Sequence, residues 1–138
     1  MKRILMGLAL ATVLGIAQAR STVMLVEPER VVLVSGTVAL TPEMVKQAIV
    51  RGGAVHQWTV ASDQPGKLQL KYNKQNKHEV SVEISYDATG FLIRYAGSTN
   101  MKYENKTGVP MIHPFYNTWV SNLSRAISSE ASRLSSGV

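Results

Sequence analysis

Residues 67–86, KLQLKYNKQNKHEVSVEISY, contain two runs in which apolar and polar side chains alternate. Successive side chains of a strand point to opposite faces of a sheet, so this alternation is typical of strands with one buried and one solvated face. The polar segment NKQNK, residues 73–77, separates the two runs and predicts the turn of a β-hairpin. The predicted buried face carries Leu68, Leu70, Tyr72, Val80, Val82, Ile84 and Tyr86.

One further strand is predicted on each side of this hairpin. VHQWTVA, residues 55–61, would place Trp58 and Val60 on the same face, and the QPG sequence that follows predicts a turn. FLIRYA, residues 91–96, continues the alternation after another polar turn. Short polar connections between alternating strands predict an antiparallel meander of four strands with one buried face.

Two amphipathic segments flank the predicted strands. Thr41 can accept hydrogen bonds from free backbone amides, and the proline after it suits a first helical turn, so a helix is expected over residues 42–52. Gly52 and Gly53 are interpreted as the end of this helix. A second helix is expected from Pro114 onwards, because apolar residues recur there at three- and four-residue steps. Its apolar residues are Tyr116, Trp119, Val120, Leu123, Ile127, Ala131 and Leu134.

Together these elements predict an α+β fold in the order α-β-β-β-β-α. An N-terminal and a C-terminal helix would cover one face of a four-stranded antiparallel meander. The domain is expected over residues 39–134, with residues 135–138 as a tail that frays. A chain of 138 residues suits one domain with a single core.

Residues 1–19 have the pattern of a secretory signal peptide. Lys2 and Arg3 precede an apolar run, and Ala17-Gln18-Ala19 matches a cleavage signature. The apolar run is shorter than the roughly 20 residues that span a bilayer, which disfavours the alternative of a membrane anchor. We therefore expect cleavage after Ala19, export to the periplasm, and no transmembrane segment in the mature chain.

Residues 20–38 would then begin the mature protein. Two short apolar runs occur here, separated by the sequence EPER at residues 27–30. A proline and two acids interrupt any continuous strand. We expect an extended lead-in that either adds an edge strand to the sheet or simply tethers the domain.

The composition restricts the kind of partner. Two of the +6 net charges belong to Lys2 and Arg3, so the mature chain carries +4. No block of like charge is dense enough for a nucleic-acid arm, and nucleic acid is not expected as a partner. A mildly basic surface can attract anionic cell-wall or lipid components. The absence of cysteine excludes disulfides, thiolate metal sites and a cysteine nucleophile.

A group of polar residues surrounds a long connection over residues 97–112, and connections of this length in small domains are often functional. His113 precedes the helix-initiating proline, and at such a position a capping or packing role is more common than acid–base catalysis. Trp119 is expected in the core. Two interpretations stay open: the group forms a polar pocket at one end of the sheet, or it is a structural network that pins the connection. The group consists of Arg94, Ser98, Asn100, His113 and Asn117.

Metal, cofactor and catalytic motifs are not found. His56, His78 and His113 are far apart, and the chain lacks a phosphate-binding loop and a nucleophile elbow. No metal, no cofactor and no catalytic residue is therefore predicted.

Three segments carry a resemblance to a known group of proteins. They are ALTPEMVKQAIVRGG at residues 39–53, VEISYDATGFLIRYAGSTNMKY at residues 82–103, and IHPFYNTWVSNLSRAI at residues 112–127. The chain resembles a family of small uncharacterised exported proteins and lipoproteins of proteobacteria over about residues 39–130. The resemblance implies an exported protein with a single small domain, and it implies no activity.

Two functional hypotheses follow. The first is an exported, non-enzymatic binding or accessory protein of the envelope, whose partner is an envelope protein or an anionic cell-wall or lipid component. Lys67, Lys71 and Arg94 would contact this partner from the open face of the sheet, where Glu79 and Glu83 are expected to pair with the lysines. The alternative is a small-ligand or hydrolytic site. It would be built from Arg94, Asn100, His113 and Asn117, with His113 facing a concave pocket and not buried against the helix start.

Overall fold

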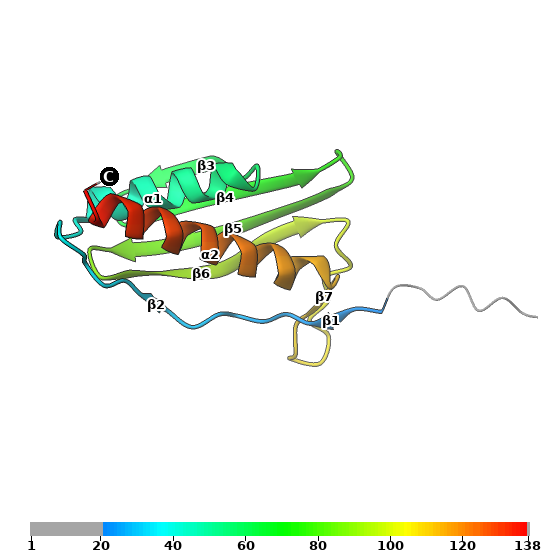
Figure 1. Cartoon of the computed structure of the whole chain (residues 1–138). Coiled ribbons are helices and arrows are strands. Elements are labelled where there is room, and N and C mark those ends of the chain that lie inside the picture. Colours follow the sequence, from blue (N-terminus) through cyan, green and yellow to red (C-terminus); the bar gives the residue numbers. More distant parts are fainter. Residues whose placement is uncertain (1–20, 138) are drawn as a thin grey trace, which may run out of the picture.

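Two helices lie side by side across one face of an antiparallel sheet in the computed structural model (Figure 1), which describes residues 21–137. The α+β class is therefore confirmed. The predicted signal peptide and its cleavage site fall outside the described residues. Among the described residues, no helix is both long enough and apolar enough to cross a membrane.

The main sheet has five strands in the order β2-β6-β5-β4-β3, and all neighbours are antiparallel. A second small sheet pairs β1 with β7. The elements are β1 (Val23–Met24), β2 (Val31–Val32), α1 (Pro42–Val55), β3 (Thr59–Gln64), β4 (Lys67–Lys74), β5 (His78–Asp87), β6 (Gly90–Thr99), β7 (Met111–Ile112) and α2 (Phe115–Ser135).

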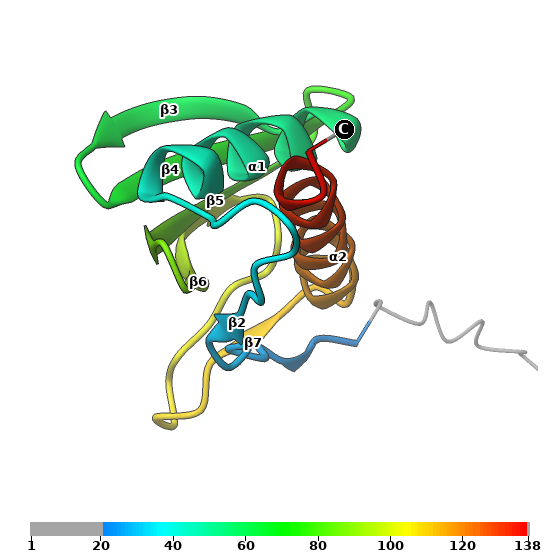
Figure 2. The same cartoon turned by 60° about the vertical axis from the view of Figure 1, so that its left-hand side comes forward.

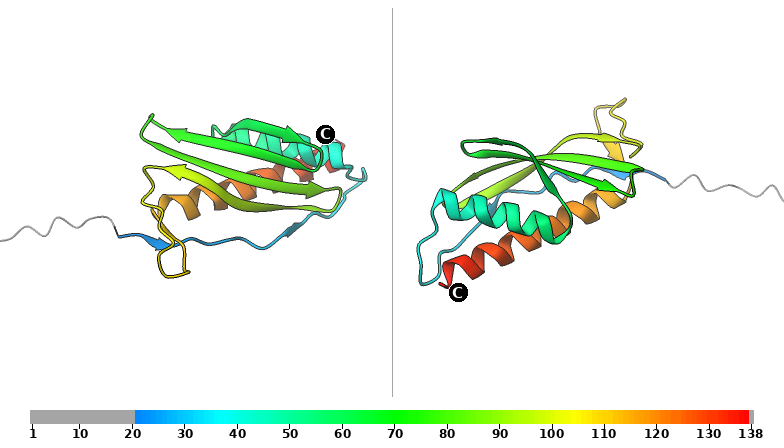
Figure 3. Two further views of the ribbon diagram at one scale, coloured as in Figure 1. Left: turned by 180° about the vertical axis from the view of Figure 1, so that it is seen from behind. Right: turned by 90° about the horizontal axis from the view of Figure 1, so that it is seen from above.

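The predicted meander forms β3 to β6, although the first strand begins at Thr59 and not at Val55. The alternation in β4 and β5 places apolar side chains under the helices, where Leu68, Val80 and Ile84 are fully buried. The other sheet face carries no helix, as the rear view shows (Figure 3). Val60 is 42% exposed although it pairs with the buried Leu70, because β3 is the edge strand.

A fifth strand comes from the lead-in, so the prediction of four strands was incomplete. Val31 pairs with Phe91 and Val32 with Gly90 on the free edge of β6. Gly90 is required here, since a Cβ atom at this position would lie 2.2 Å from the Val31 carbonyl oxygen. The lead-in therefore runs along the β6 side of the domain instead of tethering it loosely (Figures 1 and 2).

The first helix begins as predicted, with the Thr41 hydroxyl accepting a hydrogen bond from the Met44 amide at 3.2 Å. Its predicted end was wrong, because α1 continues through both glycines to Val55. Gly52 lies where α1 crosses α2, and a Cβ atom on it would lie 2.7 Å from the Ile127 nitrogen. The glycine pair permits close contact between the helices and does not end α1.

The second helix follows the prediction and buries its apolar stripe against the sheet and α1. The prediction of a fraying tail was wrong at Ser135, which is 1% exposed. Its hydroxyl accepts a hydrogen bond from the Gly36 amide and donates one to the Val38 carbonyl oxygen at 2.6 Å. The end of α2 is therefore fixed to the lead-in.

Candidate functional site

The predicted polar group does not form one pocket, because its members bond to separate parts of the backbone. Arg94 donates a hydrogen bond to the Pro28 carbonyl oxygen at 2.5 Å, and its guanidinium lies 3.5 Å from the Glu27 carboxylate. Asn117 accepts a hydrogen bond from the Val26 amide and donates one to the Met24 carbonyl oxygen, both at 2.9 Å. Both side chains hold the lead-in.

Ser98 and Asn100 order the start of the long connection. The Ser98 hydroxyl lies 2.7 Å from the Tyr95 hydroxyl, whose pKa is raised by burial. Asn100 adopts a left-handed conformation with φ of 59°, which asparagine tolerates better than most residues. Its amide donates to the Lys77 carbonyl oxygen at 2.9 Å, and its own carbonyl lies 2.8 Å from the His78 Nδ1. These contacts join the connection to the hairpin between β4 and β5.

His113 is buried against the start of α2. It is 5% exposed, its backbone amide donates to the Met101 carbonyl oxygen at 2.8 Å, and its Nδ1 accepts from the Phe115 amide at 3.1 Å. This hydrogen bond satisfies one of the free amides of the first helical turn. The expected capping or packing role thus matches the geometry of His113.

Lys67 and Lys71 lie on the open sheet face, as expected. Their ammonium groups are 3.6 Å from Glu83 and 3.3 Å from Glu79, respectively. The expected pairing with the glutamates of β5 is therefore confirmed. It offsets the positive charge that these lysines would offer to an anionic partner.

A different site lies on the helix-covered face, where a cavity of about 220 Å³ opens beside the end of α1. We name it the aromatic groove, and its lining residues are His56, Trp58, Tyr72, Trp119 and Asn122. The Trp58 and Tyr72 ring centroids are 5.5 Å apart, and the Tyr72 and Trp119 rings meet edge to face at 4.9 Å. Such aromatic pairs stabilise one another beyond the area that they bury.

The end of α1 places Trp58 in the groove. Gln57 takes a left-handed conformation with φ of 66°, and its amide bonds to the Ala54 carbonyl oxygen at 3.1 Å. The Trp58 amide bonds to the Gly53 carbonyl oxygen at 2.9 Å. These two bonds form a Schellman motif, which turns the chain back over the helix end. Trp58 is only 4% exposed and lies between the core and the groove.

The other groove residues come from β4 and α2. β3 begins at Thr59, opposite Lys71, so Tyr72 lies on β4 just beyond the last residue paired with β3. Trp119 and Asn122 are three residues apart and share one face of α2. The hairpin between β4 and β5 extends past the end of α1 (Figure 1). Tyr72 lies on this part of β4 and lines the groove.

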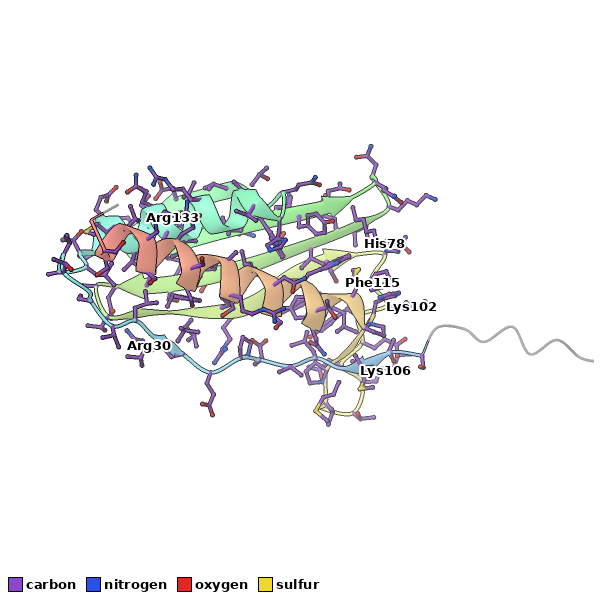
Figure 4. The ribbon with its side chains drawn as sticks, in the orientation of Figure 1. Arg30, His78, Lys102, Lys106, Phe115 and Arg133 are labelled. Carbon is purple, nitrogen blue, oxygen red and sulfur yellow. The ribbon has the colours of Figure 1, made fainter. Side chains whose placement is uncertain are left out.

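Lys74 stands at the rim of the aromatic groove. Its ammonium lies 4.5 Å from the Phe115 ring centroid and 5.9 Å from that of Trp119. Phe115 in turn lies 5.6 Å from Trp119, between centroids. Figure 4 shows Phe115 at the same end of the molecule as His78 and Lys102. Three aromatic residues thus wall the groove together with the polar groups of His56 and Asn122, and a cation lies on one side.

No sequence pattern predicted this groove, because each aromatic residue had an ordinary structural explanation. Trp58 and Tyr72 fitted strand faces, and Trp119 fitted the apolar stripe of a helix. Trp119 is only partly buried, because it packs against the core on one side and lines the groove on the other. A usable signal was present, since large aromatic residues occur in two predicted strands and in the helix that was predicted to cover them.

No protein-family model, no curated protein and no solved structure matches the chain. The resemblance to exported proteobacterial proteins therefore stays a prediction. Within residues 21–137, no three histidine, cysteine, aspartate or glutamate side chains are grouped as metal ligands would be.

Proposed function

We propose that this chain is an exported, non-enzymatic binding protein of the bacterial envelope that holds its partner in the aromatic groove. The observation that carries the proposal is the groove itself. Three large aromatic side chains and two polar ones converge on one concave surface. Concave sites with aromatic walls and a few polar groups are the usual form of ligand-binding surfaces.

The environment of His113 supports binding over hydrolysis. A general base needs a ring nitrogen within reach of a substrate, and His113 uses Nδ1 to accept the Phe115 amide while only 5% exposed. Arg94 and Asn117 are similarly engaged with the lead-in. The residues proposed for a hydrolytic site therefore have structural roles that account for them.

The open sheet face is the weaker binding surface of the two. Lys67 and Lys71 already face glutamates there, so an anionic partner would have to compete with Glu83 and Glu79. Exposed ion pairs contribute little to stability, yet they reduce the local positive potential. The export part of the proposal rests on residues 1–19, which have the pattern of a cleaved signal peptide.

Tryptophan emission offers a specific test of groove binding. The chain has two tryptophans, and both line the groove. We expect a Gram-negative envelope extract to change the emission of residues 20–138 in a saturable manner. The Trp119→Phe variant should lose most of this change while keeping its fold by circular dichroism.

A second readout separates groove binding from binding elsewhere. Immobilised protein would be incubated with the same extract, and the retained material compared between the wild type and a Lys67→Ala/Lys71→Ala variant. Equal retention supports the groove as the binding surface. Retention that requires the lysines, with unchanged tryptophan emission, would contradict the proposal.

A further inference from the structure

The aromatic groove has the chemistry of a saccharide site. Its volume of about 220 Å³ is small. Pockets for drug-sized ligands usually measure about 300–1,000 Å³, so this groove suits a single ring-sized group. The ligand class must therefore be one in which a single ring can bind both aromatic faces and polar tips.

A pyranose ring meets this requirement. One of its faces presents C–H groups, and its edge carries hydroxyl groups. The π face of an aromatic ring is negative and attracts polarised C–H hydrogens, while the polar tips of tyrosine and tryptophan bond to hydroxyls. Trp58, Tyr72 and Trp119 supply the rings of this groove.

Hydrogen-bonding groups are available at the rim. The Asn122 Oδ1 accepts a bond from Arg125 at 2.7 Å, which orients the amide and leaves its Nδ2 hydrogens as donors. Within residues 21–137 the Tyr72 hydroxyl and the His56 ring make no hydrogen bond, and the Tyr72 hydroxyl is not a buried orphan. A hydroxyl-rich ligand can satisfy all three groups.

The charges around the groove disfavour a cationic ligand. Aromatic cages often hold quaternary ammonium groups. Here none of the five lining residues is acidic, and the Lys74 ammonium lies 5.9 Å from the Trp119 ring centroid, where it would repel a second cation. Lys74 also lies 4.5 Å from the Phe115 centroid, so it interrupts the row of aromatic faces that an extended proline-rich peptide would need.

We propose that the aromatic groove binds one pyranose ring of an envelope glycan. This inference rests on the proposed function and specifies its ligand class. The Trp119 and Tyr72 rings meet edge to face, so the pyranose would stack on one of them and contact the other. Its hydroxyls would bond to Asn122, Tyr72 and His56. Neutral and acidic sugars both fit the lining, and Lys74 would favour a ring that carries a carboxylate.

The test is a titration of tryptophan emission with defined oligosaccharides. The mature chain, residues 20–138, would be titrated with hexamers of glucose, N-acetylglucosamine and galacturonic acid, and with each monosaccharide. Saturable change with at least one hexamer is expected. Because the groove holds one ring, a hexamer that binds at least as tightly as its monosaccharide would identify a glycan chain as the source. A monosaccharide that binds while its hexamer does not would identify free sugar and overturn the glycan assignment.

Two conservative variants report on the polar contacts. Tyr72→Phe and Asn122→Ala each remove one hydrogen bond, and each should weaken binding about 10-fold, since a net bond of about 1.4 kcal/mol corresponds to that factor. Tyr103→Phe, a matched change of a tyrosine outside the groove, should leave the affinity unchanged. Equal affinities for all four proteins would overturn the assignment.

Two further arms distinguish failure of this inference from failure of the proposed function. Choline chloride and a decaproline peptide replace the saccharides, and the envelope extract is treated with periodate or with protease. A change of emission with choline or with the peptide would overturn the glycan assignment and keep the binding function. The same conclusion would follow if the response to the extract survived periodate and was lost after protease treatment. Emission that responds to nothing would overturn both.

Discussion

Gln57 shows how one residue conformation determines where the groove forms. Its φ of 66° is in the left-handed region, which costs an L-residue roughly 1–2 kcal/mol. Glycine is the usual residue at this position of a Schellman motif. The chain carries this cost in the segment that turns Trp58 back over the end of α1.

Replacing Gln57 with glycine should therefore stabilise the protein. Relief of the left-handed conformation outweighs the extra backbone entropy of glycine in the unfolded chain, and we expect a net gain of about 0.5–1 kcal/mol. Urea denaturation measures it. Gln47→Gly, the same substitution at an exposed position inside α1, should destabilise by about 1 kcal/mol. A loss of stability in both variants would refute the role assigned to Gln57.

Tyr116 carries a buried hydroxyl that forms no hydrogen bond within the described part of the chain. An unsatisfied buried hydroxyl costs about 1–3 kcal/mol. Tyr116→Phe removes only this group, so the free energy of unfolding should rise by about 1 kcal/mol. A decrease, measured by urea denaturation at neutral pH, would mean that the hydroxyl has a stabilising partner.

The same residue predicts a pH dependence. Burial is the main cause that raises the pKa of Tyr116 above its usual value. A folded-state pKa above the unfolded one means that folding favours the protonated phenol. Stability is therefore unaffected below about pH 10, the ordinary tyrosine pKa, and falls as the pH rises further. The wild type should lose stability more steeply in this range than Tyr116→Phe.

At the scale of elements, the crossing of α1 and α2 depends on Gly52. A Cβ atom there would lie 2.7 Å from a backbone nitrogen of α2, whereas one on Gly53 would lie 3.1 Å from the flexible end of Leu70. The backbone of α2 cannot move aside as easily as the Leu70 side chain can. The two adjacent glycines thus differ in what surrounds them, although their sequence context is nearly the same.

Gly52→Ala should destabilise the protein by about 2–3 kcal/mol, because the helices must separate. Gly53→Ala is its matched control. The gain in helix propensity there, about 1 kcal/mol, should offset much of the local crowding. Thermal unfolding measured by circular dichroism compares the two. Equal effects would contradict the close crossing.

These elements also show what sequence patterns can and cannot predict. Alternation with a period of two is a local property, and it correctly predicted β4, β5 and β6. A glycine pair has the same local signature at a helix end and at a helix crossing, so the end of α1 was predicted too early. The pairing of Val31 with Phe91 joins residues far apart in sequence, and no local pattern encodes it. The aromatic groove is likewise a product of tertiary structure.

At the scale of the whole molecule, one face of the sheet is covered and the other is open (Figure 3). The helices cover the sheet unevenly, since α1 ends before the hairpin between β4 and β5 does (Figure 1). Beyond the end of α1, aromatic side chains of β4 and α2 form the groove together with Trp58. The lead-in crosses from β7 to β6 and closes the opposite side of the domain.

The proposed export predicts a defined mature N-terminus. Expression of the full chain in a Gram-negative host should release a periplasmic protein that begins at Arg20, because the Ala17-Gln18-Ala19 signature directs cleavage. Intact-mass measurement of the periplasmic fraction checks this. An Ala17→Arg/Ala19→Arg variant should keep its full length, and a full-length wild type confined to the cytoplasm would contradict export.

If the aromatic groove is the binding surface, the indole N–H signals of the two tryptophans report on it most directly, because both tryptophans line it. A ¹H–¹⁵N correlation spectrum would be recorded for residues 20–138 before and after addition of envelope extract. We predict that the indole signals of Trp58 and Trp119 shift in a saturable manner, while the backbone signals of Lys67 and Lys71 stay in place. Shifts confined to these lysines and their neighbours on the open sheet face, with both indole signals unchanged, would contradict binding in the groove.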